Sequence, residues 1–232
     1  MQLPPLSRRL QTCCGFVTPG DRVADIGCDH GYLGIHLLHK GIARSVIAAD
    51  VNAGPLASAK QNAHRFGTED QMTFHLSDGV QDIPRDFDTM VCAVMGADTM
   101  ISILEPAPWL KSSQYKLILQ CQSKRPELRR YLYEQGFSIQ KETLAEDGKF
   151  IYTVMEVVYT PKKPLPEREY YISQALLKSG SPLLPEFFRR VVEGIKITVQ
   201  GLSRSGGEKH EYYKRLLSEL LELEDIIHGN CS

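Results

Sequence analysis

The chain has 232 residues, of which 42% are hydrophobic and 24% charged, and its formal net charge at pH 7 is −1. These values are typical of a soluble globular protein with one good-sized domain and a smaller additional segment. A near-neutral total charge neither requires nor excludes a nucleic-acid partner, because local patches decide that.

The N-terminus and the cysteines indicate in which cellular compartment the protein is expected. Residues 1–9 lack the apolar stretch of a signal peptide, and no window approaches the roughly 18 consecutive apolar residues of a membrane span. The six cysteines include no C-x-x-C pair, so we expect reduced thiols and no metal site. A cytoplasmic protein without membrane contact is therefore expected.

Strand-like and helical runs alternate along residues 7–136. The expected helices are Ser7–Phe16, Tyr32–Lys40, Gly54–Phe66 and Arg125–Gln135. The expected strands are Arg22–Gly27, Ser45–Asp50, Met72–Leu76, Phe87–Val94 and Leu117–Gln120. Strands that alternate with helices at this spacing predict a parallel sheet with helices on both faces.

Two further strand-like runs, Phe137–Leu144 and Phe150–Val158, end this part of the chain. The segment between them contains Asp147-Gly148, a pair typical of β-hairpin turns. Five parallel strands followed by a hairpin are the layout of Rossmann-like methyltransferases, so the expected fold class is α/β.

The composition changes near Thr160. A linker is expected at Pro161, Lys162, Lys163, Pro164 and Pro166. Beyond it, apolar residues recur at steps of three and four: Phe188, Val191, Ile195, Val199 and Leu202, then Tyr213, Leu216, Leu220, Leu223 and Ile227. Two such stripes on either side of Ser203–Gly207 predict a coiled-coil-like helical hairpin. We therefore expect domains at 1–160 and 161–232.

The segment Asp25-Ile26-Gly27-Cys28-Asp29-His30-Gly31 follows a strand and precedes a helix. Gly27 permits a sharp turn, and Gly31 permits close approach of the backbone to a ligand. The following helix N-terminus favours a negative group such as a carboxylate. A dinucleotide site normally has G-x-G-x-x-G. The spacing here is G-x-x-x-G, similar to a methyltransferase motif whose ligand is zwitterionic and lacks phosphate.

Two acidic residues at later strand ends support this interpretation. Asp50 ends the second strand about twenty residues beyond the loop, where a carboxylate can accept hydrogen bonds from both hydroxyls of a ribose. Ser77-Asp78-Gly79 follows the third strand, at the usual place for a contact to adenine. The three pieces together predict S-adenosylmethionine as the cofactor.

Longer stretches resemble the bacterial tRNA adenine-N1 methyltransferase family TrmK. The resemblance begins at Leu6-Ser7-Arg8-Arg9-Leu10 and at Asp29-His30-Gly31-Tyr32-Leu33, and covers residues 6–160. It continues in order at Asp50-Val51-Asn52, Gly54-Pro55, Met95-Gly96, Leu117-Ile118-Leu119-Gln120 and Glu146-Asp147-Gly148-Lys149. It implies methyl transfer to N1 of adenine 22 in the D-arm of tRNA.

The resemblance and the loop motif together predict the cofactor-binding residues: Asp25, Gly27, Cys28, His30, Gly31, Asp50, Val51, Asp78, Gly79, Met95 and Gly96. Asp29 and Gln120 are expected to be catalytic. Neutral adenine N1 needs no strong base, but the product ring is cationic. The Asp29 carboxylate would stabilise that charge and accept a hydrogen bond from the N6 amine, and Gln120 would present its amide to a base edge. The alternatives are helix N-capping by Asp29, a structural hydrogen bond for His30 and a satisfied strand-end amide for Gln120.

The chain departs from the family at two strand ends. The family usually has Gly-Met-Gly-Gly where this chain has Val94-Met95-Gly96-Ala97, and Gln-Pro-Asn or similar where it has Gln120-Cys121-Gln122. The departures at Val94, Ala97, Cys121 and Gln122 leave two alternatives open, namely methyl transfer to another substrate and an RNA-binding paralogue without catalysis.

A tRNA partner requires cations for its phosphates. The candidates are Arg8, Arg9, Lys124, Arg125, Arg129, Arg130, Arg189 and Arg190, and each cluster could equally be a solvated helix face. Residues 161–232 contain 11 Lys and Arg against 10 Asp and Glu, so the helical hairpin is not a strongly basic clamp. The oligomeric state is left open between a monomer and a weak homodimer.

Overall fold

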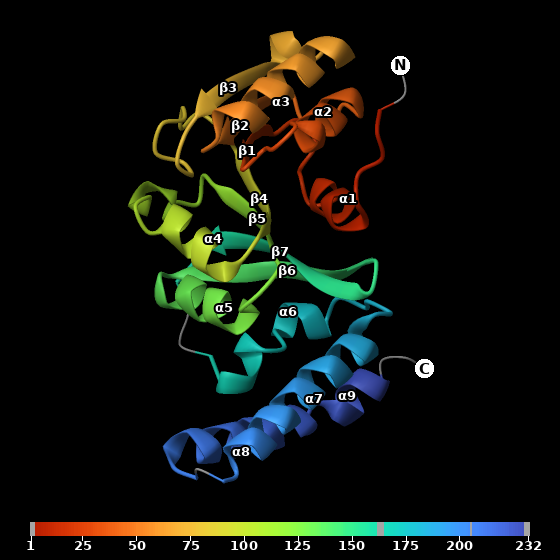
Figure 1. The fold of residues 1–232 in the computed structure, drawn as a ribbon, viewed down its shortest axis with the longest axis vertical. Coiled ribbons are helices and arrows are strands. Elements are labelled where there is room, and N and C mark those ends of the chain that lie inside the picture. Colours follow the sequence, from red (N-terminus) through yellow and green to blue (C-terminus); the bar gives the residue numbers. More distant parts are fainter. Residues whose placement is uncertain (1–2, 162–164, 205, 230–232) are drawn as a thin grey trace.

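A computed structural model describes residues 3–161, 165–204 and 206–229. Its seven strands form one sheet in the order β3-β2-β1-β4-β5-β7-β6 (Figure 1). The strands are β1 Arg22–Ile26, β2 Ser45–Asp50, β3 Met72–Leu76, β4 Thr89–Met95, β5 Lys116–Cys121, β6 Phe137–Asp147 and β7 Phe150–Tyr159. The first five are parallel, and β7 is antiparallel to both β5 and β6. The predicted parallel sheet with a terminal hairpin is confirmed.

Helices cover both faces of the sheet. They are α1 Arg8–Cys14, α2 Tyr32–His39, α3 Ala53–Phe66, α4 Ala97–Leu104, α5 Arg125–Glu134 and α6 Gln174–Leu177. Side chains alternate along each strand between the two faces. Ala24 and Ile26 of β1 therefore join the core beneath α4 and α5, whereas Val23 joins the core beneath α1 to α3.

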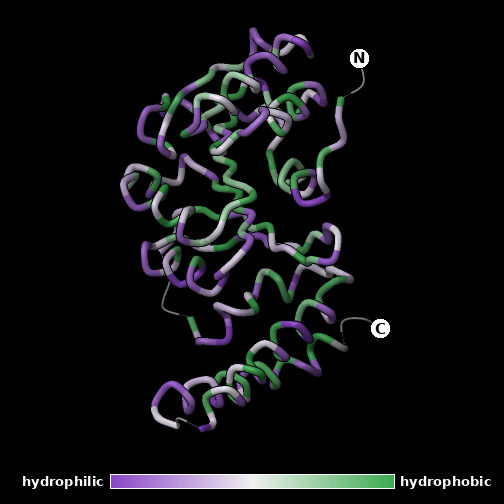
Figure 2. Tube along the Cα trace, in the orientation of Figure 1, coloured by the Kyte–Doolittle hydropathy of each residue, from purple (hydrophilic) through white to green (hydrophobic). Residues whose placement is uncertain are grey.

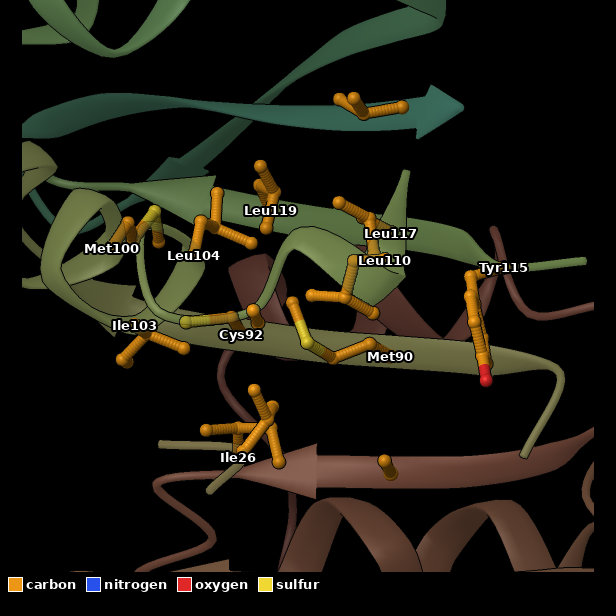
Figure 3. Close-up of a cluster of buried hydrophobic side chains, with 14 of the residues drawn as sticks. Ile26, Met90, Cys92, Met100, Ile103, Leu104, Leu110, Tyr115, Leu117 and Leu119 are labelled. Carbon is orange, nitrogen blue, oxygen red and sulfur yellow. The ribbon is translucent and has the colours of Figure 1, made fainter. Parts of the chain in front are cut away.

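The core on the α4 side lies close to the ends of the central strands. Figure 3 shows Met90 and Cys92 of β4 gathered with Leu119 of β5 and Leu104 of α4. All four side chains are at most 5% exposed. This packing fixes the positions at which β4 and β5 leave the sheet.

Helix α4 was not predicted, although Met100, Ile103 and Leu104 are buried at helical spacing. The helix has only eight residues and no side-chain hydrogen bond at its N-cap, Gly96. A short helix without capping residues gives a weak sequence signal. The boundaries of the other predicted helices and strands differ from the observed ones by at most two residues at each end. The exception is the strand predicted at Phe137–Leu144, which extends to Asp147.

The C-terminal helices extend beyond the β6 edge of the sheet (Figure 1). They are α7 Leu184–Leu202, α8 Glu208–Leu221 and α9 Glu224–Gly229. Their apolar stripes form one cluster with Leu144 and Ile151 of the β6–β7 hairpin. Figure 2 shows the hydrophobic residues of these helices alternating with hydrophilic ones along the trace. The predicted pair of helices is therefore present.

Coiled-coil geometry and the boundary at residue 160 remain predictions. Of the expected linker, Lys162, Lys163 and Pro164 lie outside the described residues, as do Ser205 of the expected turn and Cys231. Within the described ranges, none of the helices combines the length and the apolar run that crossing a bilayer requires.

Candidate active site

A cavity of about 410 Å³ opens at the carboxyl ends of β1 to β4. It lies where the strand order reverses, since β1 is followed in the chain by β2 on one side and has β4 on the other. Ligands of open α/β sheets bind at such reversal points. Ten of the predicted site residues line it: Asp25, Gly27, Cys28, Asp29, His30, Asp50, Val51, Asp78, Gly79 and Met95. The predicted residues Gly31, Gly96 and Gln120 do not line it.

Gly27 provides the turn at the end of β1. Its φ is +72°, in the region that disfavours side chains. Its N–H donates to the Ala49 carbonyl of β2 at 2.8 Å. The backbone therefore favours glycine, and a Cβ at this position, 2.1 Å from Met95 Cε, would displace the flexible end of that side chain.

Gly31 has a packing role that the sequence did not predict. Its φ is +73°, and an added Cβ would lie 3.0 Å from the Cβ of Ala59 in α3. The glycine therefore allows the loop to approach helix α3. The prediction that its backbone also approaches the cofactor stays a prediction.

Asp25 is the buried carboxylate of the site. Its side chain is 4% exposed, and Oδ2 has no hydrogen-bond partner among the described residues. Burial raises its pKa to about 7, against a lowering by a backbone hydrogen bond from Gly34 and a further raising by Asp50 and Asp29. A cationic ligand in the cavity would stabilise the ionised form.

Asp50 ties the two loops together. Its Oδ2 accepts a hydrogen bond from the Asp29 N–H at 3.1 Å, and its Oδ1 accepts one from the Asn52 N–H at 2.9 Å. Each carboxylate oxygen can accept a further hydrogen bond. The carboxylate is thus held rigidly and still has acceptor capacity for a pair of ligand hydroxyls.

Asp29 and His30 are exposed at the mouth of the cavity. Asp29 has φ +50°, and its side chain is 70% exposed. Its Oδ1 lies 3.6 Å from His30 Nε2. Helix α2 begins after Gly31 without a side-chain capping hydrogen bond, so the alternative role of Asp29 as an N-cap finds no support. The His30 carbonyl accepts a hydrogen bond from Asn62 Nδ2 at 3.0 Å, which anchors the loop to α3.

The loop after β3 completes the wall of the cavity. Ser77 is buried, with its Oγ donating to the Gly79 carbonyl at 3.0 Å and accepting from the Asp82 N–H at 3.1 Å. These bonds close the turn, so the Asp78 side chain is exposed beside the cavity. Gly79 has φ +61°, and a Cβ there would lie 2.9 Å from Ile103 of α4.

The Gln120 side chain contacts the neighbouring strand β4 and does not line the cavity. It is fully buried, and its Oε1 accepts a hydrogen bond from the Val94 N–H at 3.0 Å. Val94 interrupts the β4–β5 register and has φ +63°, an outlier for a β-branched residue. Gln120 Nε2 has no partner among the described residues. Gln120 therefore stabilises a strained residue at the cavity wall.

Helix α4 contributes lining residues that the sequence patterns missed. Thr99, Ser102 and Ile103 line the cavity opposite the β1 loop. Nothing in their local sequence marks them, because only the packing of α4 against β4 brings them there. Asn52 and Tyr32 also line the cavity beside predicted residues.

The predicted RNA-contacting cations have different environments. Arg129 is wholly buried and paired with Glu142, so the expectation that it meets RNA phosphates at the surface is wrong. Several of the others form surface ion pairs: Arg8 with Glu146, Arg9 with Asp147, Arg130 with Glu167, and Arg189 and Arg190 with Glu186. Arg125 has no carboxylate within 4 Å among the described residues.

The lining of the cavity at the ends of β1 to β4 is acidic. It includes four carboxylates, Asp25, Asp29, Asp50 and Asp78, and no Lys or Arg among the described residues. Such a cavity favours a ligand with net positive charge and disfavours a pyrophosphate. In the described ranges no group of three or more His, Cys, Asp or Glu side chains has a metal-binding arrangement.

Comparisons with known proteins agree with this geometry. Residues 6–155 match the family described as "Methyltransferase domain". The chain is 32% identical over 146 residues to the tRNA (adenine(22)-N(1))-methyltransferase of Bacillus subtilis, a match that covers 62% of this chain and 61% of that protein. It is also 32% identical over 155 residues to a putative tRNA methyltransferase of Mycoplasma pneumoniae, covering 66% of this chain and 71% of that protein.

A solved structure is similar over nearly the whole chain. The putative tRNA (m1A22) methyltransferase of Streptococcus pneumoniae, in complex with S-adenosyl-L-methionine, superposes with a TM-score of 0.83 at 25% identity. The match covers 95% of this chain and 100% of that one. The expected Rossmann-like methyltransferase fold is therefore confirmed, and the similarity includes the C-terminal helices.

Proposed function

Because the chain belongs to the methyltransferase-domain family, and within it to the TrmK family, we propose that it transfers a methyl group from S-adenosylmethionine to N1 of adenine 22 in tRNA. The observation that carries this proposal is the cavity at the ends of β1 to β4, lined by four aspartates and no cation of the described chain. S-adenosylmethionine has a net positive charge, so it suits that lining.

The residues present fit this cofactor. Asp25 Oδ2 is a buried acceptor without a partner in the described chain, available to an ammonium or a water that it binds. Asp50 retains acceptor capacity for two ribose hydroxyls, and the exposed Asp78 carboxylate suits the amine of an adenine. Gly27 keeps the loop free of a side chain where the cavity meets Met95.

The bound cofactor would supply a methyl group already activated by its sulfonium, so the protein needs to align the reactants more than to provide a base. Asp29, exposed at the mouth, would accept a hydrogen bond from the adenine N6 amine and stabilise the positive charge that develops on the ring. His30, 3.6 Å from the Asp29 carboxylate, would hold that side chain in place. Gln120 would act by positioning Val94.

The left-handed conformation of Val94 supports an active enzyme over an inactive paralogue. The family usually has glycine at this position, and glycine is the residue that adopts positive φ without strain. Here valine adopts φ +63° with its N–H held by Gln120. The loop thus keeps the backbone conformation that glycine would favour. The replacement of that glycine by Val94 has not changed this conformation.

Methylation of transcribed tRNA with radiolabelled S-adenosylmethionine tests the proposal, with the product nucleoside identified by mass spectrometry. We expect 1-methyladenosine in a tRNA with adenine 22 and none when that position is guanine. Asp29→Ala should reduce kcat by roughly 10²- to 10³-fold with little change in cofactor affinity. Asp70→Asn, in an exposed turn outside the cavity, should behave as wild type. Absence of label at any adenine N1 would refute the proposal.

The proposed substrate bears on the compartment, and the oligomeric state needs a separate measurement. A protein acting on tRNA is expected in the cytoplasm, with its thiols reduced. Among the described cysteines, Cys13, Cys14, Cys28, Cys92 and Cys121 are all free and buried. Light scattering of the purified protein distinguishes the monomer from the weak homodimer.

A further inference from the structure

A second cavity lies between the end of β5 and the C-terminal helices. It has a volume of about 270 Å³ and is lined by Gln122, Ser123, Lys124, Arg125, Pro126, Arg129, Tyr171, Arg190, Val191, Gly194 and Ile195. We call it the α5–α7 notch. Its lining includes four Lys and Arg side chains and no carboxylate among the described residues, the reverse of the cofactor cavity.

Unlike the other three cations of the notch, Arg125 has no carboxylate partner among the described residues. Lys124 is paired with Asp98, Arg190 with Glu186 and Arg129 with Glu142. By contrast, Arg125 forms no ion pair within 4 Å among the described residues; its Cζ lies 4.8 Å from the ring of Phe187, and it makes a long contact of 3.4 Å to the Ile151 carbonyl. Burial and the nearby charge of Arg129 lower its pKa. An anion in the notch would oppose this lowering by favouring the charged guanidinium.

Two features of the notch favour such an anion. The first is Arg129, which lines the notch and whose Nε has no hydrogen-bond partner among the described residues; because this side chain is wholly buried, it contributes positive charge and not a direct contact to the anion. The second is the N-terminus of α5, a helix of ten residues whose N-cap, Lys124, has φ +54° and no side-chain capping bond. The helix dipole favours an anion at this end, where Pro126 supplies no N–H and the first turn already contains Glu127.

Backbone hydrogen bonds join the wall of the notch to the wall of the cofactor cavity. The N–H of Gln122, which lines the notch, donates to the carbonyl of Met95, which lines the cavity, at 2.8 Å. The Ala97 N–H likewise donates to the Ser123 carbonyl at 3.2 Å. An adenine that leaves its stack to enter the cavity carries its backbone to the mouth. The notch, on the other side of this shared wall, is a candidate position for a neighbouring phosphate.

We propose that the α5–α7 notch binds a backbone phosphate of the substrate RNA, held by Arg125 and Arg190 from two different parts of the chain. The inference rests on the proposed function, because it takes the RNA to be the molecule whose base enters the cofactor cavity. A planar guanidinium can bind phosphate oxygens in pairs. Exposed Arg190 on α7 would close the notch over the phosphate, which gives the C-terminal helices a role in RNA binding despite their near-neutral charge.

The test compares tRNA binding by wild type, the double variant Arg125→Gln/Arg190→Gln, and Arg189→Gln. Arg189 shares its partner Glu186 with Arg190 but does not line the notch, so it is the matched control. Fluorescence anisotropy at several KCl concentrations should show roughly 10- to 100-fold weaker tRNA binding by the double variant. The slope of log K against log salt should fall by roughly 0.7–0.9 for the one phosphate lost. Arg189→Gln should keep the wild-type slope.

Binding of S-adenosylhomocysteine, measured by calorimetry, should be unchanged in the double variant, which separates loss of the notch from misfolding. Arg125→Lys, which keeps the charge, should keep the wild-type salt slope. Weaker tRNA binding with an unchanged slope would mean that Arg125 is structural, and would overturn the proposal. The proposal would also be overturned if the notch bound free AMP while the substitutions left tRNA binding unchanged.

The same experiments distinguish failure of the notch from failure of the proposed function. If tRNA binding depends on the notch but no adenine N1 is methylated, the notch is supported and the proposed reaction is wrong. If 1-methyladenosine forms equally fast in the double variant at limiting tRNA, the reaction is supported and the notch is wrong.

Discussion

The buried carboxyl of Asp25 should make the stability of the cofactor-free protein depend on pH in an unusual direction. Acidic groups in proteins more often have lowered pKa values and lose stability in acid. Asp25 has a pKa of about 7 because of burial, against 3.8 as its ordinary value. The folded state therefore holds this proton more tightly than the unfolded state does. The corresponding stability is complete below pH 3.8 and is lost as the pH rises to about 7.

The size of the effect follows from the two pKa values. Each pKa unit corresponds to 1.36 kcal/mol, so the full difference of about three units is about 4 kcal/mol. Between pH 5 and pH 8, about 2.5 kcal/mol of it should be lost. Asp25→Asn cannot ionise and should lack this loss. The variant should thus gain stability relative to wild type as the pH rises.

Urea unfolding of the cofactor-free protein at pH 5, 6, 7 and 8 measures the difference directly, since the unfolding free energy follows from the midpoint and the slope. Glu186→Gln is the control. Its carboxyl has a pKa of about 2 because of Arg189 and Arg190, so its contribution should change only in acid, below this range. A wild-type to Asp25→Asn difference that varies by less than about 1 kcal/mol between pH 5 and pH 8 would contradict the burial argument.

Three further substitutions test the packing around the site. Gly27→Ala should destabilise the protein by about 1–2 kcal/mol, because alanine is strained at φ +72°, and should weaken S-adenosylhomocysteine binding in calorimetry, because the new methyl displaces the methionine beside it. Gln120→Leu should cost roughly 1–3 kcal/mol in urea unfolding, because the Val94 N–H loses its acceptor; no loss would show that the hydrogen bond is dispensable. Arg129→Met should cost about 3–5 kcal/mol by leaving the Glu142 carboxylate buried and unpaired, and the double variant with Glu142→Leu should recover part of that in thermal melts.

Most of the cofactor cavity was predictable from the sequence because its parts are local. The segment Asp25–Gly31, Asp50 and Asp78 each lie at or just after the end of a strand whose apolar run is recognisable by itself. In a parallel sheet the carboxyl ends of neighbouring strands meet at one edge. Residues more than fifty positions apart could therefore be placed around one cavity before any contact was known.

The tertiary structure alone decided what each residue touches. Gly31 proved to make room for helix α3, Gln120 proved to hold Val94, and Arg129 proved to be buried against Glu142. Alternation and spacing report which side of a strand or helix a residue is on, but not which distant element packs there. The uncapped helix α4 is the same case, since its position depends on the core of β4 and β5.

The sequence by itself thus determined the order of the strands and helices, the glycine turn and the acidic strand ends, because these depend on residues close together in the chain. Only the tertiary structure decided that Arg125 has no carboxylate within 4 Å in the described part of the chain, while Arg190 of α7 lines the same notch. These two residues are 65 positions apart in the sequence, and no local sequence pattern predicts that they line the same notch. The charge of the notch depends on which ion pairs the packed helices complete.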